Sequence, residues 1–149
     1  MFRKSGFVLA LVVMSAAPAL AGTSVCGEEP VGPDMPSKAE IMNKPVAESD
    51  AAINQAYQDV KSWQKQLANY RNCLDAATRQ DKREIADARQ RGGNDAKDQV
   101  SDLNADISAA DTKHNASVAD ETQVAGEFNT LWKSYCSRPN AKASSWPKQ

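Results

Sequence analysis

The chain has 149 residues, of which 41% are hydrophobic and 25% are charged, and its formal net charge is −1 at pH 7. This length fits a single domain. The near-neutral charge argues against binding to nucleic acid or to an anionic membrane surface, because both need a clear positive excess or patch. Basic and acidic residues are interspersed, as on a solvated helix face. We therefore expect no nucleic-acid partner.

Residues 1–21 have the pattern of a secretory signal peptide. Arg3 and Lys4 provide a basic start, the run 6–18 is almost wholly apolar, and residues 19–21 form an Ala-x-Ala cleavage site. The apolar run is shorter than the about 20 residues of a spanning helix, so we expect no stable membrane insertion after cleavage. We predict cleavage after Ala21 and a periplasmic or secreted protein. Removing Arg3 and Lys4 leaves 16 basic and 19 acidic residues, a net charge of −3.

Residues 22–48 are predicted to be a proline-rich tail. Pro30, Pro33 and Pro36 favour extended or turn conformations. Ser37, with Glu40 three residues later, is a capping-box pattern. A short helix over 38–42 is therefore one interpretation, and plain coil is the other.

The hairpin is predicted to span residues 49–137, and its first long helix to begin near Ser49, a good N-cap. Asp81 and Glu84 interrupt the apolar stripe of this helix before it resumes at Ile85. No glycine or proline occurs from residue 51 to 91, so the helix should run for about 40 residues, roughly 60 Å. Its apolar or small residues recur at alternating steps of three and four, the heptad pattern of packed helices, at Ile53, Ala56, Val60, Trp63, Leu67, Tyr70, Leu74 and Ala77.

Residues 91–94 are predicted to be the turn, because Gly92 and Gly93 supply the positive φ angles that end a helix. A second helix with the same spacing follows, to about residue 137, and residues 138–149 should form a flexible C-terminal tail. The apolar, small or polar positions of its stripe are Val100, Leu103, Ile107, Ala110, His114, Ser117, Glu121, Val124, Phe128, Leu131 and Tyr135.

Two long helices joined by a short turn predict an all-α, coiled-coil-like antiparallel hairpin. Counting from the turn pairs Ile53 with Leu131, Val60 with Val124, Tyr70 with His114, Ala77 with Ile107 and Ile85 with Val100. One such seam is thin for independent stability. We favour the tail and a disulfide as the supplement, with a homodimer that forms a four-helix bundle as the alternative.

The three cysteines, Cys26, Cys73 and Cys136, all follow the predicted cleavage site. An exported chain meets an oxidising compartment, so one disulfide and one free or intermolecular thiol are expected. In a straight hairpin Cys73 and Cys136 lie about 36 Å apart, too far to bond. The tail is long enough for Cys26 to reach either of them.

The chain resembles a group of small, uncharacterised exported helical proteins of Gram-negative bacteria. The resemblance rests on Cys26 in the proline-rich tail, on an aromatic-x6-Tyr-x2-Cys-Leu helix and on an Asn that follows a Phe near the end of the second helix, here Trp63, Tyr70, Cys73, Leu74, Phe128 and Asn129. It implies an architecture and a compartment, and no particular chemistry. It also implies the pairing of Cys26 with Cys73, which leaves Cys136 as the free or intermolecular thiol.

The histidine and the aromatic residues are expected to pack in the hairpin and not to form a catalytic or metal site. His114, the single histidine, is expected to be a buried or half-buried polar residue with Tyr70 as a hydrogen-bond neighbour, because metal sites and catalysis both need convergent partners. Trp63 and Tyr70 are expected in the core. No set of acid, base and nucleophile is apparent, so we predict a non-enzyme with no metal and no cofactor.

We therefore expect a structural or protein-interaction role with a protein partner that the sequence does not name. The alternative is a thiol-dependent redox or accessory partner that uses Cys136.

Overall fold

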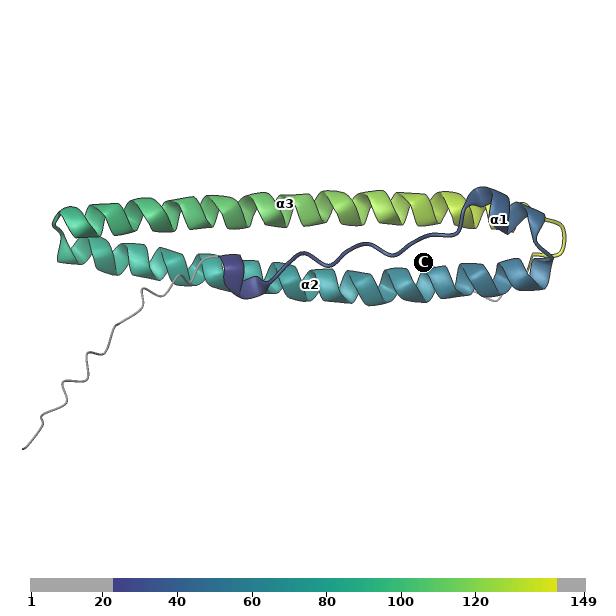
Figure 1. Ribbon diagram of the computed structural model, residues 1–149, viewed down its shortest axis with the longest axis horizontal. Helices are drawn as coiled ribbons and strands as arrows, with labels where there is room; N and C mark the ends of the chain where they lie inside the picture. The colour runs from purple at the N-terminus through teal and green to yellow at the C-terminus, as the bar shows by residue number, and fades with distance from the viewer. Residues whose placement is uncertain (1–22, 142–149) are drawn as a thin grey trace, which may run out of the picture.

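The computed structural model describes residues 23–141 (Figure 1). The predicted signal peptide and its cleavage site, and most of the predicted C-terminal tail, lie outside these residues. A short 3-10 helix η1 (Thr23–Cys26) is followed by an extended segment (residues 27–37) and by α1 (Lys38–Asn43). The long helices α2 (Val46–Arg91) and α3 (Asn94–Cys136) complete the fold. The prediction of an all-α hairpin is confirmed.

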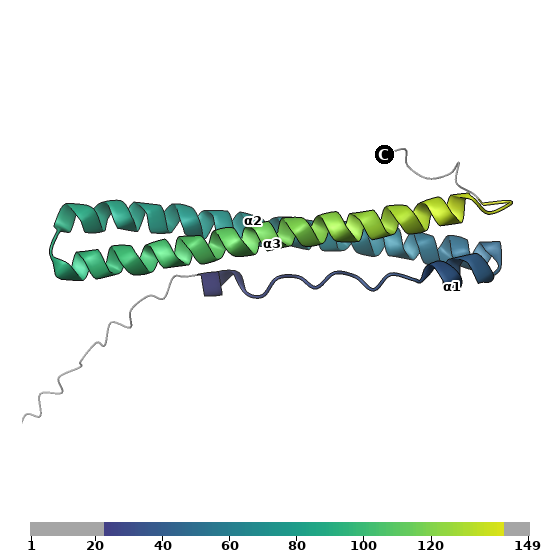
Figure 2. The same ribbon diagram turned by 90° about the horizontal axis from the view of Figure 1, so that it is seen from above.

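The two long helices lie antiparallel along their whole length, and the extended segment with α1 lies along one side of them (Figures 1 and 2). The turn between them consists of Gly92 and Gly93, with φ angles of 70° and 88°. Positive φ combined with extended ψ is open to glycine and strained for other residues, so both glycines are required for a turn this short. The turn lies within the predicted range 91–94.

The seam between α2 and α3 has the register that the heptad pattern predicts at the open end of the hairpin. Ile53 packs with Leu131, and Val60 packs with Val124 and Phe128. Towards the middle, Tyr70 and Leu74 pack against Ala110. The large side chain of Tyr70 packs over the small side chain of alanine, as close packing requires.

Helix α1 confirms the predicted short helix and its capping box. The Ser37 backbone N–H donates to Glu40 Oε2 at 2.7 Å, and the Glu40 N–H donates to Ser37 Oγ at 3.2 Å. These reciprocal bonds satisfy donors that a helix start leaves unpaired. Ile41, the buried residue of α1, packs with Ile53, Leu131 and Tyr135, so α1 closes the open end of the hairpin.

The predicted start of the first long helix at Ser49 is wrong, since α2 begins at Val46 after Pro45. Pro45 is the N-cap: its ψ of 146° is extended, and its carbonyl accepts the Ser49 N–H at 3.0 Å, so the helix begins without a side-chain cap. Ser49 instead lies fully buried within the first turn. Its hydroxyl donates to the Ile41 carbonyl at 2.8 Å, which is one of the carbonyls that the end of α1 leaves free.

The predicted flexible region after residue 137 begins with an anchored residue, Arg138. Its guanidinium donates to the carbonyls of Ile41 at 2.5 Å and Lys44 at 2.7 Å, and to Ser49 Oγ at 2.6 Å. The planar fork of arginine matches several acceptors at once. Arg138 therefore holds the end of α1 against both long helices.

We expect Arg138→Lys to loosen α1, because a lysine ammonium cannot span both carbonyls. Hydrogen bonds from a charged group contribute about 1.5–3 kcal/mol, so amides of α1 should lose hydrogen-exchange protection by roughly that free energy. Lys133→Arg, at an exposed position of α3, is the control and should leave α1 unchanged. Unaltered exchange in Arg138→Lys would show that the apolar contacts of Ile41 are sufficient.

Candidate functional site

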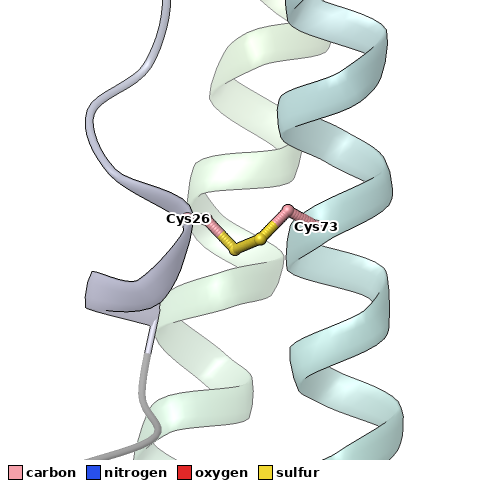
Figure 3. The surroundings of a disulfide bond; sticks show 2 residues. All are labelled: Cys26 and Cys73. Carbon is pink, nitrogen blue, oxygen red and sulfur yellow. A yellow bond between two sulfur atoms is a disulfide. The ribbon is translucent and has the colours of Figure 1, made fainter.

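The most distinctive feature of the hairpin is the segment that crosses it between η1 and α1. At its start, Cys26 and Cys73 have their sulfur atoms 2.10 Å apart and their Cα atoms 5.7 Å apart, which is disulfide geometry (Figure 3). Cys73 lies on the flank of α2, beside the seam residue Leu74, so its side chain reaches the segment and not α3. This is the pairing that the resemblance implies, and Cys136 is the free cysteine.

The segment then lies close over the seam. Trp63, which is buried, donates its Nε1–H to the Pro30 carbonyl at 2.9 Å. Gly32 approaches α3 so closely that a Cβ there would stand 3.3 Å from Val124 Cγ2. Met35 packs on the cluster of Ala56, Val60 and Phe128. Trp63 is buried, as expected for a core residue. Its burial depends on the segment, because the segment covers it.

One residue of the segment is poorly accommodated. Glu29 Oε1 is buried and has no hydrogen-bond partner among the described residues. Burial raises the pKa of Glu29, the carboxylate of Asp120 raises it further, and Arg71 opposes them. Arg71 itself is engaged elsewhere, because its Nη2 donates to Glu121 Oε2 at 2.6 Å. The negative charge of Glu29 therefore disfavours the position of the segment on the hairpin.

Arg71 and Glu121 form the polar centre of the hairpin. Gln64 also donates to Glu121, through Nε2 to Oε1 at 3.0 Å, and joins the same centre from α2. Ser117 is buried beside them and donates to the His114 carbonyl at 2.7 Å. Sequence periodicity placed Glu121 and Ser117 on the seam but did not reveal Arg71, which lies one residue from Tyr70 and reaches across from the flank.

His114 is half-buried, as expected, and its hydrogen bond with Tyr70 stays a prediction. Its Nε2 lies 4.0 Å from Asp75 Oδ1, an ion pair only when the imidazole is protonated. Tyr70 is buried in the cluster with Leu74 and Ala110. Burial raises the pKa of its hydroxyl, and Glu29 raises it further.

Cys136 packs at the open end of the hairpin, beside the cluster of Ile41, Ile53, Leu131 and Tyr135. The thiol is half-buried, and burial raises its pKa. Thiol–disulfide exchange requires the thiolate, which a raised pKa makes scarcer at neutral pH. The surroundings of Cys136 therefore disfavour the redox role that the sequence left open.

We expect Cys136 to react slowly with iodoacetamide at pH 7 in the native protein. Unfolding in denaturant should accelerate alkylation at least about tenfold, because it exposes the thiol and returns its pKa to the ordinary value. The rate is measured by mass spectrometry of the Cys136 peptide. Equal rates in native and unfolded protein would restore the case for a reactive thiol.

A third polar feature lies near the hairpin turn, in the half that the segment does not cover. Asp81 is 1% exposed, and its Oδ1 has no hydrogen-bond partner among the described residues. Burial raises the pKa of this carboxyl, and the carboxylates of Asp106 and Glu84 raise it further. The sequence showed Asp81 as a break in the apolar stripe; the structure buries it in the seam.

None of these residues forms a recognisable catalytic or metal centre. Within residues 23–141, no group of three or more His, Cys, Asp or Glu side chains is placed to hold a metal ion. No helix in the same range is long and apolar enough to cross a membrane. An open groove of about 660 Å³ runs beside the end of the segment, between residues 35–38 and the stretch Gln123–Ser134 of α3.

No family model, curated protein or solved structure matches the chain. The protein is therefore classified by its fold alone. The protein is an all-α helical hairpin whose N-terminal segment lies on the seam with Cys26 and Cys73 at disulfide distance.

Proposed function

We propose that the protein is exported to the periplasm or beyond and acts there as a non-enzymatic helical protein that binds a partner protein. The observation that carries the proposal is the contact of Cys26 with Cys73, because a disulfide that orders the molecule suits an oxidising compartment. A long hairpin of two helices offers an extended surface, which suits binding or a structural role better than catalysis.

Export is tested by fractionating cells and determining the N-terminus of the protein. Export predicts a chain that begins at Gly22 in the periplasmic or secreted fraction. A cytoplasmic chain that keeps residues 1–21 would overturn it.

Binding is tested by chemical crosslinking of the native exported protein, followed by purification and mass spectrometry of the linked peptides. The proposal requires links from α2 or α3 to one recurrent protein. Links within single molecules alone would favour a purely structural role.

A homodimer remains the second arrangement to test, and sedimentation at micromolar concentration distinguishes it. A monomer that melts cooperatively would show that the segment and the disulfide suffice to stabilise the hairpin. A dimer at all accessible concentrations would show that the four-helix bundle is the functional unit.

A further inference from the structure

The segment between η1 and α1 occupies its position on the hairpin in an unusual way. Its two ends are held firmly: Cys26 by Cys73, and α1 by the buried Ile41 and by Arg138. Between them the chain is extended and lies on the seam of α2 and α3 (Figure 2). It has proline at every third position, 30, 33 and 36, which is the period of the polyproline II helix.

The surface beneath has the chemistry that recognises such a segment. The buried Trp63 presents an indole N–H to a carbonyl that an extended chain leaves free. A Cβ at position 32 would stand 3.3 Å from Val124 Cγ2, a tight contact that favours glycine there, and the cluster of Val60 and Phe128 receives Met35. Aromatic-lined grooves with an indole or phenol donor are a recurrent way to bind proline-rich peptides.

The segment itself is an imperfect ligand for this surface. Glu29 brings a buried carboxylate oxygen without a partner next to Asp120. A chain selected only to stabilise the hairpin would do better with a neutral side chain there, because an unpaired buried carboxylate costs free energy. The segment therefore combines favourable contacts at Pro30 and Met35 with one unfavourable residue, Glu29, between two tethered ends.

We propose that the seam surface around Trp63, Val124 and Phe128 is a binding site for an extended, proline-containing segment of a partner protein, and that residues 27–37 block it until the Cys26–Cys73 disulfide is reduced. This rests on the proposed binding role and names its surface, its partner and its regulation. The partner segment carries a small residue at the position of Gly32 and a neutral residue at that of Glu29.

The opening step is thiol–disulfide exchange with an exported dithiol reductant. A thiolate of the reductant attacks one sulfur of the disulfide, which forms a mixed disulfide and releases the other cysteine as a thiolate that takes up a proton. The second thiol of the reductant, as its thiolate, then attacks the reductant's first sulfur in the mixed disulfide. This step forms the reductant's own disulfide and releases the remaining cysteine, which takes up a proton. The reductant leaves oxidised by two electrons, and Cys26 and Cys73 are both thiols.

The test uses the purified protein and fluorescein-labelled peptides of residues 27–37. Binding is measured by fluorescence anisotropy with the protein oxidised and with it reduced by dithiothreitol. We expect the oxidised protein to bind neither the native peptide nor the Glu29→Gln peptide. The reduced protein should bind both, with the Glu29→Gln peptide at least about fivefold tighter because it removes the unpaired carboxylate. A Gly32→Val peptide should not bind, since its side chain would meet Val124.

Variants of the protein assign the site. Trp63→Phe removes the indole donor and should weaken peptide binding by the reduced protein about fivefold. Gly32→Val in the protein should strengthen it, because the chain's own segment then competes poorly. Val31→Ala is the matched control, since Val31 is 92% exposed and its side chain faces solvent.

Each other outcome overturns the proposal. Loss of helical circular dichroism on reduction would mean that the segment is structural only. A reduced protein that stays folded but binds no peptide would mean that the surface is not a binding site. Equal affinity for the native and the Gly32→Val peptides would mean the same. Dimerisation of the reduced protein by exchange of its own segment would make a second copy the occupant. Crosslinks of the oxidised protein to a partner are independent of these results, so the proposed function survives a failure here.

Discussion

Replacing Cys73 by alanine is expected to lower the free energy of unfolding by about 4 kcal/mol. The disulfide closes a loop with a sequence separation of 47 residues, and its loss restores that loop's entropy to the unfolded chain. Removal of the bond also frees the segment from Trp63. Chemical denaturation followed by circular dichroism measures the change, and the melting temperature should fall by on the order of 15 °C.

Two comparisons separate this effect from a local one. Cys26→Ala should cost as much as Cys73→Ala, and the double variant should cost no more than either, because all three remove the same bond. Cys136→Ala is the matched control and should change stability by less than about 1 kcal/mol, since its thiol is free and half-buried. Additive losses in the double variant would contradict a Cys26–Cys73 bond.

Asp81→Asn is expected to stabilise the protein by about 1–3 kcal/mol at pH 7, because it removes a buried, unpaired charge, which costs more than an unpaired neutral group. The carboxylate is buried in the seam with one oxygen unpaired, and the carboxylates of Asp106 on α3 and Glu84 on α2 add repulsion. The amide of asparagine has nearly the same shape and no charge.

The gain should depend on pH in a defined direction. Burial raises the pKa of Asp81 above its ordinary value of 3.8, so the folded state prefers the protonated carboxyl. Protonation of Asp81 therefore adds to the free energy of unfolding. This added stability is fully present below the ordinary pKa and is lost as pH rises through the raised pKa. The difference between Asp81→Asn and the parent should therefore be small near pH 3.5 and greatest at neutral pH.

Denaturation curves from pH 3.5 to pH 8 measure this difference. Asp87→Asn is the control, because Asp87 is on the same helix and exposed. A gain that is equal at all pH values would mean that Asp81 is not the group responsible. Hydrogen exchange adds a spatial check: the amides near the hairpin turn should gain protection, while those of α1 should not.

The order of the helices could be predicted because it depends on local features. The alternation of three and four residues from Ile53 to Ala77 defines the seam of α2, and two adjacent glycines define the turn. Ser37 and Glu40 sit three apart and cap α1 by themselves. The structure starts α2 at Val46, three residues before the predicted Ser49, and the Ser49 hydroxyl donates to the Ile41 carbonyl in place of capping the helix.

The features of the candidate site were less predictable because they depend on where distant segments meet. Arg138 appeared to belong to a flexible end, and only the fold brings it to Ile41 and Lys44. Sequence patterns assigned no role to Glu29, and only the fold brings its carboxylate near that of Asp120. No spacing rule links residues so far apart, so sequence alone carried no signal for either contact.

By itself, the sequence determined the two long helices and the antiparallel hairpin, because periodicity and glycine pairs act over a few residues; it offered the short capped helix as one of two interpretations. The tertiary structure decided which flank of the seam the N-terminal segment covers, which side chains it buries and which charges it leaves unpaired. Those outcomes depend on contacts between segments tens of residues apart, where desolvation and close packing select among arrangements that local preferences leave equal.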